Sequence, residues 1–111
     1  ENRKVSISRL RRALAIRLRR NISLEQFVST PLWEERRSGN QLAINPKHRD
    51  YPCILAEALD IAFASEFDMR IAADTSQISS TQLLKIITHE PAAFVWLNEQ
   101  RKERGLSALK I

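Results

Sequence analysis

Apolar residues recur along most of this chain at intervals of three and four, the spacing of one face of an α-helix. Within residues 1–22, four aliphatic positions share one side of such a helix: Ile7, Leu10, Leu14 and Leu18. Four arginines lie broadly on the other side: Arg9, Arg12, Arg19 and Arg20. The pattern predicts an amphipathic helix that buries its aliphatic side and exposes its guanidinium groups.

Capping signals predict two short helices after this segment. Residues 23–26 read Ser-Leu-Glu-Gln, a capping box in which the serine and glutamine side chains satisfy backbone amides at a helix start. This helix is expected to end near Ser29. Thr30 precedes Pro31, and a first helical turn tolerates proline because its missing amide would be unpaired there. A second short helix is therefore expected, ending at Ser38 and Gly39.

The strongest helical pattern begins at Pro52. It follows a break over residues 40–51, where Asn45 precedes a proline and favours an extended or turn conformation. Six apolar residues then fall on one wide face: Ile54, Leu55, Ala58, Leu59, Ala62 and Phe63. Such a face is typical of a central core helix. Cys53 is expected to be a small core residue on this helix.

Three further helices are predicted in the rest of the chain. Asp68 is a candidate N-cap for a helix that ends near Ala73, and Ser79 or Ser80 for a helix that ends near residue 88. Proline at position 91 opens the last helix, and glycine at position 105 ends it in a left-handed conformation. The residues of this helix expected to face inward are Ala92, Val95, Trp96 and Leu97.

The chain is therefore predicted to be all-α, with about six helices. Residues 1–22 form a basic amphipathic helix, as an arm or as the tail of an upstream domain. Residues 23–111 form one small, compact helical domain, a size that suits a single core. The pattern leaves the oligomeric state open.

Five positions match the spacing of a helix-turn-helix pair: Ala73, Gln77, Ile78, Leu83 and Ile86. In that motif a small residue lets two helices approach, and apolar residues fix the second helix. Four polar residues would then face outward and could hydrogen-bond phosphates or base edges: Ser80, Thr81, Gln82 and Lys85. The turn position is usually glycine, and a generic pair of packed helices has the same spacing.

Charge is concentrated at one end of the chain. Residues 1–20 hold eight basic side chains and one acid, whereas the whole chain has a formal net charge of +5. The eight basic residues are Arg3, Lys4, Arg9, Arg11, Arg12, Arg17, Arg19 and Arg20. A charge concentrated in this way attracts polyanions through counterion release, so nucleic acid is the expected partner.

Catalytic and metal chemistry find little support in the sequence. His48 and His89 lie far apart, and neither has a metal-ligand spacing to an acid, a histidine or a cysteine. The two glycines, Gly39 and Gly105, form no phosphate-binding loop. We therefore expect no cofactor, no metal site and no enzyme activity from these residues.

No apolar run approaches the roughly 20 residues that span a bilayer, so no membrane partner is expected. The single cysteine fits a cytoplasmic protein.

Three stretches carry a family resemblance. Residues 1–20 open with Glu-Asn-Arg-Lys and continue with Leu-Arg-Arg-Ala-Leu and Arg-Leu-Arg-Arg. Residues 42–52 read Leu-Ala-Ile-Asn-Pro-Lys-His-Arg-Asp-Tyr-Pro, and Ile-Leu-Ala-Glu-Ala-Leu-Asp follows at residues 54–60. Residues 78–106 contain Ile-Ser-Ser-Thr-Gln-Leu-Leu-Lys, Glu-Pro-Ala-Ala and Arg-Gly-Leu. The first stretch resembles the basic helix that follows the catalytic loop in class I peptide chain release factor-like proteins. The others resemble a C-terminal extension in a bacterial subgroup of that family.

The resemblance implies a ribosome-associated protein in which a Gly-Gly-Gln loop promotes hydrolysis of the peptidyl-tRNA ester. That tripeptide is absent from the chain, so no catalytic residue is carried over. The basic helix contacts ribosomal RNA in the family, and it is carried over at the eight basic positions named above. The chain begins with Glu1 and would be the region downstream of a catalytic domain. No stop-codon-reading element is matched, so termination and ribosome rescue both stay open.

Two other classes of function stay open from the residues themselves. One is a DNA-binding regulator that uses the second helix of the helix-turn-helix-like pair for readout and binds as a two-fold dimer. The other is a protein-interaction module, in which the aliphatic side of the first helix docks on a partner and the arginines keep it in solution.

Overall fold

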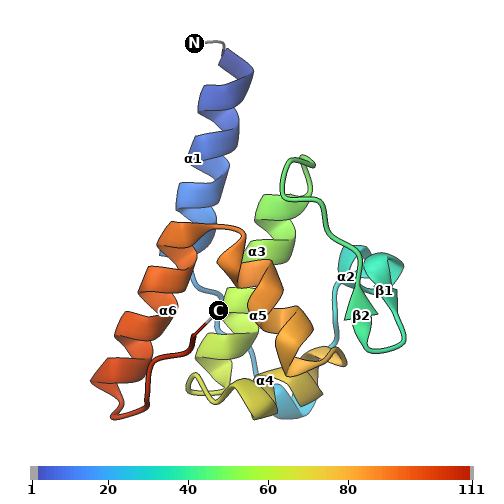
Figure 1. The fold of residues 1–111 in the computed structure, drawn as a ribbon. Coiled ribbons are helices and arrows are strands. Elements are labelled where there is room, and N and C mark those ends of the chain that lie inside the picture. Colours follow the sequence, from blue (N-terminus) through green and yellow to red (C-terminus); the bar gives the residue numbers. More distant parts are fainter. Residues whose placement is uncertain (1–2, 111) are drawn as a thin grey trace.

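Six α-helices make up most of the described chain, which in this computed structural model comprises the backbone of residues 3–110 and the side chains of residues 7–110. The helices are α1 (Arg3–Arg17), α2 (Pro31–Arg36), α3 (Tyr51–Ala64), α4 (Met69–Ser76), α5 (Ser80–Thr88) and α6 (Pro91–Glu103) (Figure 1). A single 3-10 turn, η1 (Leu24–Gln26), precedes α2. Two-residue strands, β1 (Arg37–Ser38) and β2 (Gln41–Leu42), pair antiparallel after it. The predicted all-α fold with about six helices is confirmed.

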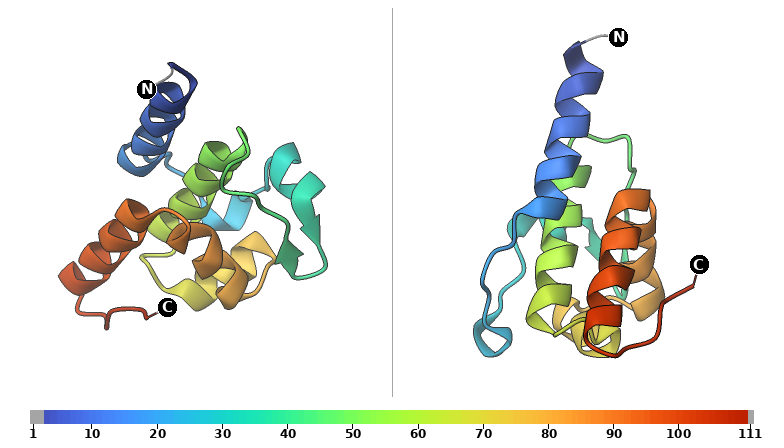
Figure 2. Two further views of the ribbon diagram at one scale, coloured as in Figure 1. Left: turned by 45° about the horizontal axis from the view of Figure 1, so that its top comes forward. Right: turned by 90° about the vertical axis from the view of Figure 1, so that its left-hand side faces the viewer.

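The central helix is α3, and α1, α4 and α5 all contact it (Figures 1 and 2). Five of the six apolar residues predicted for its core face are fully buried: Ile54, Leu55, Ala58, Leu59 and Ala62. Phe63 is half-buried and packs against this cluster. Burying a large aliphatic side chain contributes about 1.5–3 kcal/mol relative to leaving it in water. This face therefore supplies much of the energy that holds the helices together.

Two buried aromatic side chains tie neighbouring helices together by hydrogen bonds. Trp33 on α2 donates from Nε1 to the carbonyl oxygen of Ser76 at the end of α4, at 3.0 Å. Tyr51, the first residue of α3, donates from its hydroxyl to the carbonyl oxygen of Ile86 in α5, at 2.7 Å. Both rings are fully buried, so each combines apolar burial with a satisfied polar group.

The helix caps confirm several predicted starts and the predicted last end. Three side chains accept a hydrogen bond from a backbone amide of the first turn that follows them: Thr30, Asp68 and Ser79. After α6, Gly105 takes the left-handed conformation with φ at 75°. The amide of Leu106 then reaches back to the carbonyl of Arg101 at 2.9 Å, which completes a Schellman motif.

Two predictions for residues 23–39 are wrong. The capping box does not form, since Ser23 makes no side-chain cap bond and the helix is only the 3-10 turn η1. The chain becomes extended at once at Phe27, whose ring packs against the core. Helix α2 ends at Arg36 and not at Ser38 and Gly39, because the chain enters the β1–β2 hairpin, in which Gly39 has a φ of 60°.

The inward face of α6 differs in part from the prediction. Its buried residues recur every four positions: Ala93, Leu97 and Arg101. Val95 is 57% exposed, Ala92 is exposed and Trp96 is half-buried. Because residues 92–97 are all apolar, their periodicity does not specify which side packs. Cys53 also departs from its predicted place, since it is exposed on the first turn of α3.

Candidate nucleic-acid interface

The orientation of α1 is the reverse of the predicted one. The four aliphatic side chains expected in the core are 41%, 58%, 43% and 65% exposed, in the order Ile7, Leu10, Leu14 and Leu18. The side that packs is marked by Ala15, which is buried, and Ile16, which is half-buried. The C-terminal half of α1 meets α3 and α6, whereas its N-terminal half extends past the rest of the fold (Figures 1 and 2).

Arg12 is held by the body of the protein. Its Nη1 lies 3.4 Å from Oε1 of Glu90, and its Nη2 donates to the carbonyl oxygen of Pro46. Its guanidinium carbon lies 5.1 Å from the centre of the Tyr51 ring. A guanidinium over an aromatic face is stabilised by the quadrupole of the ring. Arg12 therefore contacts three separate segments instead of facing solvent.

Arg19 is held more deeply. Its Nη1 lies 2.9 Å from Oδ1 of Asp60, and the two side chains are only 11% and 7% exposed. Its guanidinium carbon lies 5.4 Å from the centre of the Trp96 ring, and the backbone amide of Arg20 donates to the same carboxylate oxygen at 3.1 Å. Burial raises the pKa of Asp60, and the Arg20 amide and the Arg19 charge offset this only in part. Burial likewise lowers the pKa of Arg19.

The eight basic residues predicted to bind nucleic acid therefore fall into three groups. Arg12 and Arg19 lie in the joint between α1 and the rest of the fold. Four others are exposed: Arg9, Arg11, Arg17 and Arg20. The side chains of Arg3 and Lys4 lie outside the described residues.

A groove of about 1320 Å³ runs between α1 and the first turns of α3 and α6. Four arginines of α1 line it: Arg9, Arg11, Arg12 and Arg17. The rest of the lining includes Lys47, His48 and Arg49 from the loop before α3, and Pro52 and Ala92 at the starts of α3 and α6. Two basic segments from separate parts of the chain thus meet at one groove.

The groove carries a strong excess of positive charge. Among its described lining residues Glu90 is the single acid, and it pairs with Arg12. Lys47 and Arg49 are exposed and add to the exposed arginines of α1. Neither residue was predicted as a binding residue, although the Lys-His-Arg tripeptide is visible in the sequence as a local cluster. Such an arrangement can neutralise several phosphates of a polyanion.

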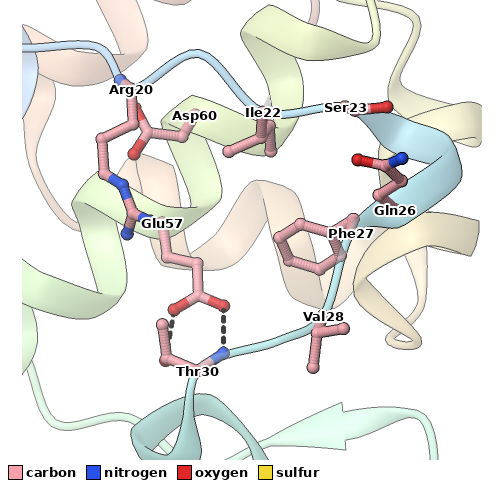
Figure 3. Close-up of a pocket in the computed structure, with 9 residues that line it drawn as sticks. All are labelled: Arg20, Ile22, Ser23, Gln26, Phe27, Val28, Thr30, Glu57 and Asp60. Carbon is pink, nitrogen blue, oxygen red and sulfur yellow. Dashed lines mark hydrogen bonds between the residues drawn. The ribbon is translucent and has the colours of Figure 1, made fainter.

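Arg20 is separated from this groove. It lines a smaller pocket of about 320 Å³ (Figure 3). There the carboxylate of Glu57 accepts hydrogen bonds from the backbone amide of Thr30 at 3.2 Å and from its hydroxyl at 2.5 Å. Asp60 lines the same pocket. Two carboxylates beside one guanidinium do not favour a polyanion, so Arg20 adds little to the basic groove.

Helices α4 and α5 form a tightly connected pair, with Gln77 left-handed at φ 63° where the helix-turn-helix motif usually has glycine. The apolar positions of the motif are buried: Ala73, Ile78, Leu83 and Ile86. Three of the four candidate readout residues are exposed: Ser80, Thr81 and Lys85. Gln82 is half-buried, and its side-chain oxygen accepts a 3.5 Å hydrogen bond from the amide of Leu42. The β1–β2 hairpin therefore lies against the start of α5.

Residues 3–110 show no metal site and no membrane span. Within this range no group of three or more His, Cys, Asp and Glu side chains could hold a metal ion. None of the described helices is long and apolar enough to cross a bilayer. Comparisons with protein-family models, with curated proteins and with solved structures found no match to the chain.

Proposed function

We propose that the groove beside α1 binds the phosphate backbone of RNA. The proposal is carried by exposed basic side chains that converge on one groove from two segments: Arg9, Arg11, Arg17, Lys47 and Arg49. Each neutralised phosphate releases counterions, which gives affinity without sequence specificity. Arginine suits this task because its planar fork donates two hydrogen bonds to a phosphate and its face stacks on exposed bases.

The dimensions of the basic surface suit a folded RNA. From Arg9 to Arg17 the helix rises about 12 Å, at ~1.5 Å per residue. Along the axis of a B-form duplex each strand carries one phosphate per about 3.4 Å, so a duplex aligned with α1 presents roughly three or four phosphates per strand over this span. Lys47 and Arg49 extend the charge sideways from α1. A folded RNA presents its backbone in more than one direction and can use both parts of the groove.

Within this proposal the chain is the RNA-contacting, non-catalytic C-terminal region of a release factor-like protein. It acts in the cytoplasm, in translation termination or ribosome rescue, and its partner is ribosomal RNA. Support comes from the family resemblance, because the groove is lined by residues from all three stretches that carry it, residues 1–20, 42–52 and 78–106. The carried-over role of the basic helix is assigned to its exposed arginines.

The two arginines in the joint have a different role in the proposal. Arg12 and Arg19 hold α1 against α3 and α6, so the exposed arginines of α1 keep a fixed position beside the loop before α3. Replacing either one would weaken RNA binding indirectly, through the placement of α1.

A salt series with paired variants tests the RNA groove. We expect the logarithm of the association constant for a structured ribosomal RNA fragment to fall linearly with the logarithm of salt concentration. Lys47→Glu/Arg49→Glu should weaken binding and reduce the slope by about 1.4–1.8, at ~0.7–0.9 per lost contact. The matched control is Arg70→Glu/Lys102→Glu, which makes the same charge change at exposed residues outside the groove. Affinity that is independent of salt, or equal losses in the two double variants, would contradict the proposal.

A helix-turn-helix regulator that reads duplex DNA is the second candidate. The left-handed turn at Gln77 and the exposure of Ser80, Thr81 and Lys85 favour it. Thr81→Glu/Lys85→Glu separates the two functions. A duplex reader should lose a preferred DNA site with this variant and should behave as a dimer. The RNA groove should be insensitive to it.

A further inference from the structure

The exposed side of α1 carries an apolar feature that lies mainly outside the proposed RNA groove. We call it the aliphatic stripe, and it consists of Ile7, Leu10 and Leu14 of α1 and of Leu18, which directly follows α1 and donates its amide to the carbonyl of Leu14 at 2.9 Å. Ile7 lies at the edge of the basic groove, whereas the three leucines do not line it and face a different side of the helix. Contiguous apolar side chains on the surface of a soluble domain commonly mark a site of interaction.

The stripe has the geometry of a helix-docking seam. Its members are separated by three, four and four residues, a spacing that stays aligned on an almost straight helix at about 3.67 residues per turn. From Ile7 to Leu18 the seam is about 16 Å long, or three helical turns. At 100° per residue, Arg11 lies about 20° beyond Leu18 on one border, and Arg17 lies about 20° beyond Leu10 on the other.

Charge determines which kind of helix fits this seam. Every charged residue of the segment 3–20 is basic, so guanidinium groups border the stripe on both sides. A second copy of α1 would bring Arg11 and Arg17 against the same groups, and like charges across a helical seam oppose pairing. A helix with acidic residues beside its apolar seam would pair with them instead.

An anionic membrane fits the stripe less well than an acidic helix. Helices that lie in a membrane interface present a broad apolar face, often with aromatic residues. The stripe covers only about 80° of the helix circumference and contains only aliphatic side chains. Helix α1 cannot roll to widen this face, because Ala15 and Ile16 pack against the body on another side.

We propose that the aliphatic stripe docks an acidic amphipathic helix of another protein. The apolar residues of the partner would lie between Leu10, Leu14 and Leu18, and its carboxylates would lie beside Arg11 and Arg17. The proposal goes beyond RNA binding, because it assigns a protein partner to the three leucines, which do not line the groove, whereas Arg11 and Arg17 border both surfaces.

Two synthetic helical peptides provide the test. Both carry leucines at the three-four-four spacing, and their flanking residues are glutamates in one peptide and lysines in the other. We expect the fluorescently labelled glutamate peptide to bind, with an affinity that falls as salt rises, and the lysine peptide not to bind. Leu10→Gln/Leu14→Gln should weaken binding at least tenfold, since glutamine keeps the helix propensity and removes the apolar contact. Val28→Gln/Ile71→Gln is the matched control, because it changes two exposed aliphatic residues outside α1.

A charge-reversal variant tests the contribution of the flanking arginines, independently of the leucines. Arg11→Glu/Arg17→Glu should prefer the lysine peptide over the glutamate peptide, and far-ultraviolet circular dichroism checks that the helices persist. Equal binding of both peptides, or an unchanged affinity of Leu10→Gln/Leu14→Gln, overturns the proposal.

Two further results would replace the acidic helix with another occupant. Dimerisation that the leucine variant abolishes would assign the stripe to a second copy of the chain. Binding to phosphatidylserine vesicles that the leucine variant abolishes would assign it to a membrane. RNA binding is expected to survive Leu10→Gln/Leu14→Gln, so the helix-docking proposal and the RNA-binding proposal can be refuted independently.

Discussion

Removing the carboxylate of Asp60 is expected to destabilise the protein more than removing the whole ion pair with Arg19. The two side chains are 7% and 11% exposed, so both charges are almost fully withdrawn from water. Burial raises the pKa of Asp60 even though the Arg20 amide and the Arg19 charge oppose the shift. The free-energy cost of removing the Asp60 carboxylate from water therefore exceeds the stabilisation that its partners provide. This is common for buried ion pairs.

The loss of stability in Asp60→Ala can be estimated from the contacts that Arg19 retains in this variant. Asp60→Ala strands a buried guanidinium, and breaking a buried pair in this way costs about 3–5 kcal/mol. Arg19 still donates to the carbonyl oxygen of Ala15 and still lies over the Trp96 ring. These contacts place the loss at the low end, about 3 kcal/mol. Arg19→Met/Asp60→Ala removes both charges and should recover at least half of that loss.

Urea unfolding followed by far-ultraviolet circular dichroism measures the difference. With a slope of ~2 kcal/mol per molar urea, a loss of ~3 kcal/mol lowers the midpoint by about 1.5 M. The control is Glu34→Ala, which breaks an exposed ion pair with Arg37 and should move the midpoint much less. If Asp60→Ala matches this control, the buried pair is screened by solvent. If the double variant is no more stable than Asp60→Ala, a stranded charge is not the cause.

The pH dependence of stability is an independent measure of the balance between burial and pairing at Asp60. Because the folded pKa of Asp60 is raised, the native state holds this proton more tightly than the unfolded state does. The stability of the wild type should therefore fall relative to that of Asp60→Asn as pH rises from about 4, the unfolded value for aspartate, through the raised folded pKa. A difference that grows in the opposite direction would mean that pairing outweighs desolvation.

Three further predictions concern the core and the turns. Trp33→Phe should cost about 1–3 kcal/mol in urea unfolding, because it leaves the buried carbonyl of Ser76 without its donor. Gln77→Gly should raise the Tm by a few degrees, because the left-handed conformation costs a residue with a Cβ about 1–2 kcal/mol, more than the ~0.5–1 kcal/mol of added unfolded-state entropy. Tyr51 is the single tyrosine, and burial is the main cause of its strongly raised pKa, so tyrosinate absorbance should appear only when the protein unfolds. Its contribution to stability is present below pH ~10, the unfolded value, and is lost as pH rises above it.

Helix ends were largely predictable from the sequence because they depend on groups within one turn. Prolines in the first turn mark the starts of three helices: Pro31, Pro52 and Pro91. Gly105 closes α6 through its own backbone conformation. The failure at residues 23–26 has a tertiary cause, since Phe27 leaves the helical conformation and packs against the core. Local capping chemistry was present there, but packing overrode it.

The candidate RNA groove was predictable only in part. Its α1 arginines were visible as a basic run, and Lys47 and Arg49 were visible as a second, smaller cluster. Nothing local places the two clusters together, because Arg12 fixes α1 through Pro46 and Glu90, which lie 34 and 78 positions later in the chain. Contacts between such distant positions leave no periodic signal in the sequence.

The orientation of α1 follows from the groups that the body presents to it. Rotating α1 to bury the aliphatic stripe would shelter mainly Leu14 and Leu18, because the N-terminal half extends past the fold (Figure 1). That gain is about 3–6 kcal/mol if both side chains become fully buried. The same rotation would withdraw Arg19 from Asp60 and leave a buried carboxylate unpaired, at a cost of about 3–5 kcal/mol. These two terms nearly cancel, so neither one decides the orientation.

The remaining contacts decide it in favour of the observed side. Rotation would also pull Arg12 away from Glu90 and from the face of the Tyr51 ring. It would bring Ala15 and Ile16 back into water. The guanidinium groups and the two small apolar contacts therefore select the same side of α1, and the aliphatic stripe stays in solvent. A hydrophobic pattern alone could not have predicted this, because the selection depends on two acids and two rings that lie in α3 and in or just before α6.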